Sequence, residues 1–215
     1  MDKEEFKFYK DNVLLDNEAS YVPFGFAFQA DAGIYLFCNY YENAESIKIE
    51  SALQDIEIKK NDGKYIMAQA KAAQNPFNCK DYKSKLNDAL FSLARHYVNS
   101  DDTLFYVSNI PNMFGNEMKN QFNDTVFSFN ELSDKARLII KDGYDTLKKK
   151  ILDSLEDNQN TEKQKEKLKI ILRKINDINY SSLCFLSISR YKDDCQKQSL
   201  KEKIASLLSR VFKFD

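Results

Sequence analysis

The spacing of apolar residues changes along the first third of this 215-residue chain, and that change constrains the fold more than any other feature. Over residues 24–41 apolar side chains recur every three to four positions, which predicts a helix with one buried face. Polar and apolar residues then alternate, which is typical of strands, and Asp62-Gly63 predicts a tight hairpin turn between two of them. The expected strands are residues 46–50, 56–59 and 65–71. A helix followed by a three-strand meander is therefore expected.

The chain continues with a second helical segment and then with an uninterrupted apolar run. Residues 80–98 return to helical spacing, and residues 103–110 (TLFYVSNI) are typical of a strand that is buried on both faces and usually parallel to its neighbours. Only five Gly and three Pro occur in the whole chain, which favours long helices joined by short links. The further elements that we expect are a short strand at 125–129, helices at about 130–157 and 161–177, a strand at 182–189 and a closing helix at 199–212.

This order of elements predicts an α/β fold in which a mixed sheet is flanked by helices. We expect residues 1–125 to form the core and residues 126–215 to form a mainly helical extension packed on it, with one late strand at about 182–189. The lysine-rich stretch 148–174 is expected to form solvated helix faces, and a DNA-facing surface is the alternative.

Charge and composition exclude several classes of protein. Lys and Arg number 32 against 33 Asp and Glu, a net charge of −1, which excludes a chain that binds nucleic acid through bulk positive charge. No run approaches 18 apolar residues, and the charged start MDKEEFKFYKDN is unlike a secretory signal. The four cysteines lack paired spacing and are expected to be free thiols in a reducing compartment. We therefore expect a cytoplasmic protein without a membrane partner.

Several catalytic motifs are missing. The sequence has no GxGxxG, no GxxxxGK[ST] and no GxSxG, so neither a phosphate-binding glycine loop nor a serine nucleophile elbow is supported. His96 is the only histidine, which excludes histidine-rich metal sites, and we interpret it as a structural or surface residue.

Polar residues that carry chemistry gather instead on the meander. Gln69 and Lys71 lie two positions apart on the third strand, so they share a face at a separation of roughly 7 Å. The hairpin folds that strand back on the second one, which brings Asp55 close to their level, and Glu50 ends the first strand. Glu57 lies on the same face as Asp55 by parity. Two acids, an amide and an ammonium group are thus expected to converge on one edge of the sheet.

This set of groups suits metal-assisted phosphodiester hydrolysis. Carboxylates bind Mg²⁺, the ion activates water and polarises the phosphate, and a lysine stabilises the developing charge. Because Gln69 offers only a neutral oxygen, Glu50 is the natural second anionic ligand beside Asp55, and Glu57 is a weaker candidate. Ordinary solvent-facing polar residues on a strand are the alternative interpretation. Ala68 and Ala70 alternate with the polar pair, which is the pattern of a buried strand that delivers a site.

Three segments resemble the PD-(D/E)xK nuclease superfamily. They are Gly25-Phe26-Ala27-Phe28-Gln29, Glu50-x4-Asp55-Ile56-Glu57-Ile58 and Ala68-Gln69-Ala70-Lys71. The pattern is similar to the double-stranded-DNA endonuclease effector domain of bacterial anti-phage systems of the CBASS, Lamassu and Avs types, and its Gln-x-Lys variant is similar to the Mrr-type restriction endonucleases. Ala70 stands where that family usually has a branched residue, and no Pro precedes Asp55.

The resemblance covers about residues 24–110 and implies a restriction-endonuclease-like αβββαβ core. It also implies that Asp55 and Lys71 are catalytic, that Gln69 occupies the (D/E) position and that Glu50 assists with the metal. Gln29 would lie beside the site from the first helix.

From these observations we expect a Mg²⁺- or Mn²⁺-dependent endonuclease that hydrolyses double-stranded DNA as an effector in bacterial anti-phage defence. Partner proteins or further copies of the chain are expected in a defence complex, because a nuclease that harms its host needs restraint. Two alternatives stay open. One is a catalytically silent nuclease-fold subunit that serves as a protein-interaction module in such a complex, and the other is an RNA- or tRNA-directed nuclease with the same metal site.

Overall fold

The computed structural model describes residues 23–50, 54–97, 100–118, 124–157 and 160–188, together with residues 201–202, 204–206 and 208–209. The long helices are α2 (Pro23–Tyr40), α3 (Tyr82–His96), α4 (Asp134–Glu156) and α5 (Glu162–Asp177). The strands are β1 (Ala44–Ile49), β2 (Ile56–Lys60), β3 (Tyr65–Lys71), β4 (Thr103–Ser108), β5 (Val126–Ser128) and β6 (Leu183–Ser187). The expected α/β class, with a mixed sheet and flanking helices, is confirmed.

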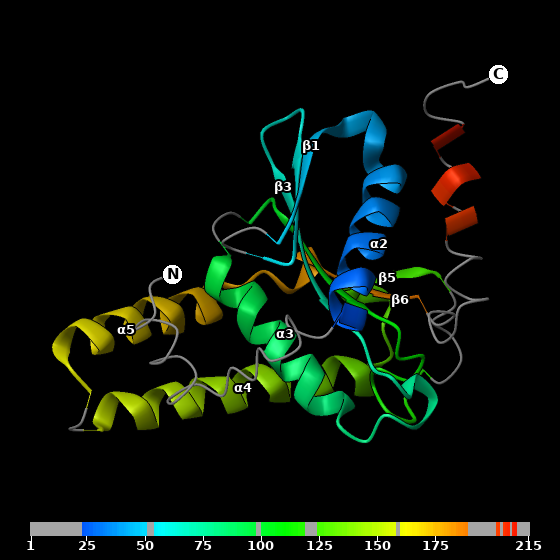
Figure 1. Ribbon diagram of the computed structural model, residues 1–215. Coiled ribbons are helices and arrows are strands. Elements are labelled where there is room, and N and C mark those ends of the chain that lie inside the picture. Colours follow the sequence, from blue (N-terminus) through cyan, green and yellow to red (C-terminus); the bar gives the residue numbers. More distant parts are fainter. Residues whose placement is uncertain are drawn as a thin grey trace.

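The six strands form one sheet in the order β1-β2-β3-β4-β6-β5 (Figure 1). The first three strands form the expected antiparallel meander, in which Ile56 pairs with Ala68. β4 lies parallel to β3 and to β6, which confirms the parallel strand predicted from the apolar run at 103–110. β5 closes the far edge antiparallel to β6. The end of β3, where the candidate residues gather, is therefore flanked by β2 and β4.

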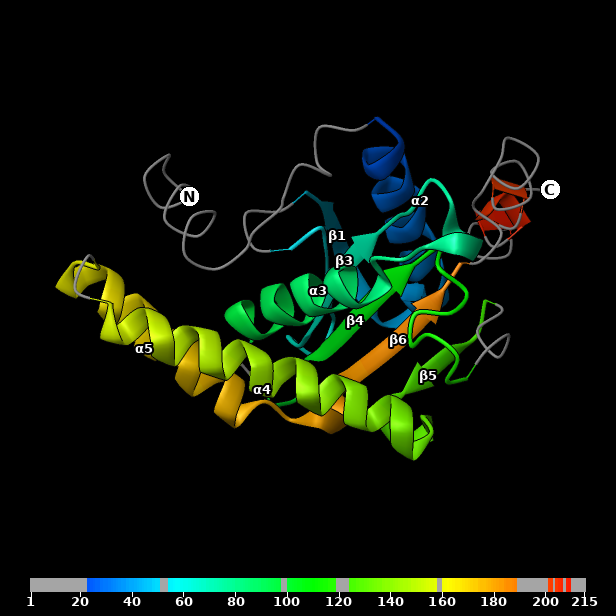
Figure 2. The ribbon, with the colours of Figure 1, turned by 90° about the horizontal axis from the view of Figure 1, so that it is seen from below.

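Helices cover both faces of the sheet because strand residues alternate between two apolar clusters (Figures 1 and 2). On one face α2 packs against the even-numbered residues of β3, including Ile66 and Ala68. On the other face α3, α4 and α5 pack against Met67, Leu104 and their neighbours. α4 and α5 form a helical hairpin that extends past the sheet in Figure 2. The site at the end of β3 thus lies between two packed helical layers.

The expected late strand is β6, which lies inside the sheet between β4 and β5. The segment after residue 125 therefore contributes strands to the sheet and also covers it with helices, and a domain boundary near that residue stays a prediction. Of the closing helix expected at 199–212, the described residues between 201 and 209 are helical, and the remaining ones lie outside the described residues. Residue 189 of the expected strand 182–189 lies outside them as well.

Three of the four cysteines are free thiols, namely Cys38, Cys79 and Cys184, whereas Cys195 lies outside the described residues. His96 is half-buried at the end of α3, where burial and the charges of Arg95 and Lys174 lower its pKa to about 4. A helix both long and apolar enough to cross a membrane does not occur within the described parts of the chain.

Candidate active site

Asp55 lies directly before β2 and is fixed to the end of β3. Its Oδ2 accepts a hydrogen bond of 2.9 Å from the backbone N–H of Ala70. This bond orients the carboxylate at the edge of the sheet, where the antiparallel pairing of β2 and β3 places it level with Gln69 and Lys71. The convergence that the sequence predicts for Asp55 and the third strand is therefore present in the geometry.

Two buried glutamine side chains reach Asp55, one from helix α2 and one from the sheet. Gln29 comes from α2 and Gln69 from β3, each is only 4% exposed, and both make side-chain hydrogen bonds to the Asp55 carboxylate. In the orientation that pairs donors with acceptors, Gln69 Nε2 lies 3.3 Å from Asp55 Oδ2, and its Oε1 accepts from the Asp55 N–H at 3.2 Å. Both amides therefore hold the carboxylate, and Gln29 lies where the resemblance implies.

Gln54 is a buried member of this cluster that sequence reasoning missed. Its side-chain oxygen lies 2.5 Å from the nearest side-chain amide atom of Gln69. Gln54 Nε2 in turn donates to the backbone carbonyl of Ser92 on α3 at 3.0 Å. Gln54 thus connects the site to the α3 layer. Its position next to Asp55 in the sequence was the only available signal, since it lies in a loop without periodicity.

The Oε1 atom of Gln29 is buried without a hydrogen-bond partner. Leaving a buried polar atom unsatisfied costs about 1–3 kcal/mol, so native proteins pair almost all such atoms with protein, water or an ion. The Gln29 amide also contacts Asp55. The unpaired oxygen therefore indicates a place near Asp55 for a further polar group.

Glu50 follows β1 in a left-handed backbone conformation, with φ of 54°. Such a conformation is uncommon for a residue other than glycine and occurs at functional sites that the surrounding structure holds in place. A hydrogen bond of 2.7 Å from Glu50 N to Asp55 O closes the intervening loop. Glu50 is therefore brought back to Asp55, as the sequence predicts.

The charges of Glu50, Asp55 and Lys71 influence one another. Burial raises the pKa of Asp55, and the Lys71 ammonium, the Ala70 N–H and the two amides oppose that rise only in part. Burial and the Asp55 charge raise the pKa of Glu50, and Lys71 again opposes the rise. Two carboxylates and one ammonium thus share a partly dehydrated edge of the sheet, an environment that attracts a further positive charge.

Glu57 takes a different place. It lies within β2 opposite Met67, and its carboxylate pairs with Lys48 on β1 at 3.3 Å. Two residues of strand displace it by roughly 7 Å from Asp55. Of the two candidates for the second acid, Glu50 is the one that the structure links to Asp55.

The described residues contain no group of three or more His, Cys, Asp and Glu side chains that could hold a metal ion. Asp55 and Glu50 make a two-carboxylate set instead, which suits Mg²⁺, because this ion usually keeps several waters and binds one or two carboxylates together with substrate phosphate. The donor chemistry therefore fits a substrate-assisted magnesium site rather than an all-protein cage.

A comparison of the chain with protein-family models, curated proteins and solved structures found no match. What kind of site this is must therefore be inferred from its own geometry. Two carboxylates, glutamine amides and a lysine lie together at the end of β3 in a mixed α/β sheet.

Proposed function

We propose that this chain is a metal-dependent DNA endonuclease of the PD-(D/E)xK type. The observation that carries the proposal is the gathering of Asp55, Glu50 and Lys71 at one sheet edge, with Asp55 fixed by the Ala70 N–H. The element order α2-β1-β2-β3-α3-β4 agrees with the αβββαβ core that the resemblance implies, which supports the same class. The anti-phage effector role and the defence complex belong to this proposal through the resemblance alone, and a cytoplasmic setting belongs to it through the unpaired spacing of the cysteines.

The residues present fit a divalent ion such as Mg²⁺ or Mn²⁺. Asp55 and Glu50 would hold it as hard oxygen ligands, and Gln29, whose side chain contacts Asp55, has an unpartnered Oε1 that would accept a hydrogen bond from water. When bound, the ion supplies polarisation of the phosphate and a lowered pKa of bound water.

Each side chain of the site has a separate role in hydrolysis. Gln29 and Gln69 hold the Asp55 carboxylate in one orientation through their amides. The Lys71 ammonium stabilises the negative charge that develops on the scissile phosphate as a water molecule attacks it. The attacking water forms a new P–O bond and gives a proton to solvent. The P–O3′ bond breaks and the leaving 3′ oxygen takes a proton from solvent, which leaves a 3′ hydroxyl on one strand end and a 5′ phosphate on the other.

Cleavage of supercoiled plasmid in Mg²⁺ or Mn²⁺ tests the proposal. We expect Asp55→Asn, Glu50→Gln and Lys71→Ala each to lower the rate by about 100-fold or more, because each removes a group that meets the developing charge or the ion. Glu57→Gln is the matched control, since this carboxylate pairs with Lys48. Cleavage that survives in both Asp55→Asn and Lys71→Ala would remove this site from consideration, and an inactive Glu57→Gln variant would reassign the second acid.

A second candidate function, the protein-interaction module, is supported by the surface of the α4–α5 hairpin. Three large apolar side chains there are exposed, namely Leu138, Leu152 and Ile170. Leu138 and Leu152 lie on α4 and Ile170 on α5, so the two helices of this hairpin offer apolar side chains to a partner protein. This surface is compatible with either function, because an effector nuclease also needs partners.

A further inference from the structure

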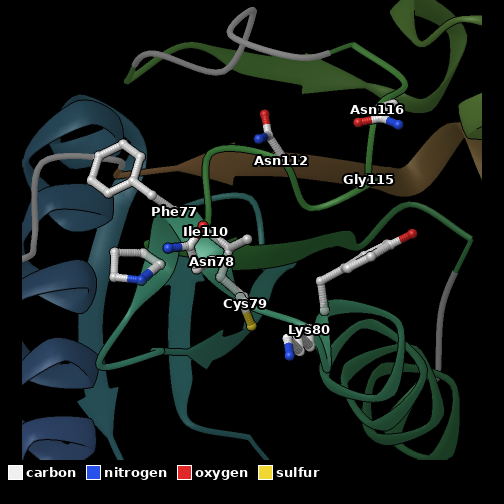
Figure 3. A pocket seen from close by; sticks show the side chains of 10 residues that line it. Phe77, Asn78, Cys79, Lys80, Ile110, Asn112, Gly115 and Asn116 are labelled. Atoms are coloured by element: carbon white, nitrogen blue, oxygen red, sulfur yellow. The ribbon is translucent and has the colours of Figure 1, made fainter.

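The loop between β3 and α3, residues 72–81, leaves the candidate active site and lines two neighbouring cavities. Each cavity has a volume of about 430 Å³, and they share Asn78, Cys79 and Lys80. The first cavity, shown in Figure 3, also takes residues from the turn after β4, and the second begins at Ala72, directly after Lys71. We call the first one the Phe77 pocket, after its most exposed aromatic residue.

The start of this loop is anchored by buried side chains. The Asn109 side chain accepts a hydrogen bond from Ala73 N at 2.7 Å and donates one to Ala73 O at 2.8 Å. The Ser108 hydroxyl donates to the backbone carbonyl of Lys71 at 2.8 Å. The loop is therefore held against the end of β4, so the Phe77 pocket keeps a defined position relative to the active site.

The far wall of the Phe77 pocket is fixed as well. Gly115 has a φ of 68°, and a Cβ atom there would lie 2.5 Å from the Tyr82 hydroxyl. Only glycine allows this close approach of the turn after β4 to the first residue of α3. The pocket therefore lies between the 72–81 loop and the turn after β4, and its volume is within the range of small-molecule sites.

The lining of the pocket combines three kinds of group. Phe77 is 55% exposed and supplies an aromatic face, Lys80 supplies a cation, and amides surround them at Asn78, Asn112 and Asn116. Figure 3 shows the Phe77 ring at one end of the pocket and Asn116 at the other. Aromatic rings stack on nucleobases, side-chain amides pair with base edges, and lysine binds phosphate. Together these groups match the base and the phosphate of a nucleotide.

The carboxylate and the thiol near the pocket do not repel the phosphate of a nucleotide. Asp81 pairs with Lys85 at 3.5 Å and accepts a hydrogen bond from the Cys79 thiol at 3.0 Å. Burial and the Asp81 contact raise the pKa of Cys79 to about 11, which keeps the thiol neutral. The negative charge at this place is therefore locally compensated.

We propose that the Phe77 pocket binds an unpaired nucleotide of the substrate strand, close to the phosphate that is cleaved. Phe77 follows Lys71 by six positions, a span of at most about 20 Å, so the bound base lies within about six nucleotides of the scissile bond. The inference rests on the proposed nuclease function and adds a substrate class to it, namely strands with an unpaired or extruded base.

Binding measured without divalent ions tests the pocket independently of cleavage. The probe is a fluorescein-labelled single-stranded DNA 12-mer in EDTA. The full chain is added to it, and fluorescence anisotropy measures how much of the oligonucleotide is bound. We expect Phe77→Ala to weaken binding about tenfold or more, because stacking on an aromatic side chain contributes that much per base. Phe26→Ala is the matched control, since Phe26 is 50% exposed on α2 and does not line the pocket. Equal affinities of Phe77→Ala and Phe26→Ala would overturn the proposal.

Salt titration separates stacking from charge. We expect Lys80→Ala to lower the slope of log affinity against log salt by about one, and Phe77→Ala to leave that slope unchanged. A second arm adds free deoxyadenosine monophosphate as competitor. If it displaces the oligonucleotide at comparable concentration, the ligand is a free nucleotide and the substrate-strand assignment is wrong.

The two proposals fail separately. If plasmid cleavage depends on Asp55 but oligonucleotide binding does not depend on Phe77, only the pocket assignment is overturned. If binding depends on Phe77 while cleavage is unaffected by Asp55→Asn, the nucleotide pocket stands and the proposed active site is wrong.

Discussion

Asp55 is the residue at which stability and function conflict most directly in this molecule. Its carboxylate is oriented by the Ala70 N–H and two amides, yet burial still raises its pKa above the ordinary value. A group that must stay charged to bind a cation is therefore held in a place that disfavours its charge. Conflicts of this kind are common where activity needs a preorganised but destabilising arrangement.

A stability measurement follows from the direction of this shift. Because the pKa of Asp55 is higher in the folded chain, the folded state binds more protons, and its stability falls as pH rises from about 3.8 through the folded pKa. We expect Asp55→Asn to raise Tm by a few degrees at pH 7 in EDTA and to make Tm depend less on pH above about 4. Glu50→Gln should act in the same direction, because the pKa of Glu50 is raised too.

Addition of Mg²⁺ supplies the control for this prediction. A ligand that binds only the folded chain raises its stability, so Mg²⁺ should raise Tm of the wild type and leave the Asp55→Asn variant unchanged. A Tm of Asp55→Asn below that of the wild type in EDTA would contradict the proposed conflict.

At the scale of elements, the connection between β3 and β4 joins the active site to the Phe77 pocket. Asn109 is fully buried and satisfies both backbone groups of Ala73. We expect Asn109→Ala to lower the free energy of unfolding by about 2 kcal/mol, because it leaves a buried N–H and a buried carbonyl unpaired.

Urea unfolding at pH 7 measures this loss. The matched control is Asn78→Ala, an exposed amide of the same loop, whose effect should stay within about 0.5 kcal/mol. If the two asparagine variants lose the same stability, the loop is not anchored as described.

The elements that the sequence predicts well are those with a local signal. Alternation and the Asp62-Gly63 turn identify β2 and β3, and the apolar run at 103–110 identifies a parallel strand. Within the candidate site, the hairpin register alone places Asp55 level with Gln69, whereas the contact between Gln54 and Ser92 depends on how α3 packs. The hydrogen bonds between Asn109 and Ala73 and the Phe77 pocket also depend on contacts between segments that are distant in the chain. Such contacts leave no periodic pattern in the sequence.

At the scale of the whole molecule, the question is whether the chain acts by cleaving DNA or by holding partners together. Under the proposed defence role, phage infection of bacteria that express either the wild type or the Asp55→Asn variant together with its partners distinguishes the two functions. We expect this variant to lose protection, because the fold and the exposed apolar side chains of the α4–α5 hairpin are retained while the carboxylate charge is removed. Protection at the wild-type level would favour the interaction module, with immunoblotting to confirm equal expression.

The place of β6 between β4 and β5 has a consequence for how this chain matures on the ribosome. β5 has its only pairing in the described sheet with β6, so residues 126–128 wait for residues 183–187 to be synthesised. The parallel edge of β4 stays open over the same interval, since β6 is its partner there. Translation of more than fifty further residues separates β5 from its partner, so the nascent chain carries an unfinished sheet until late in its synthesis.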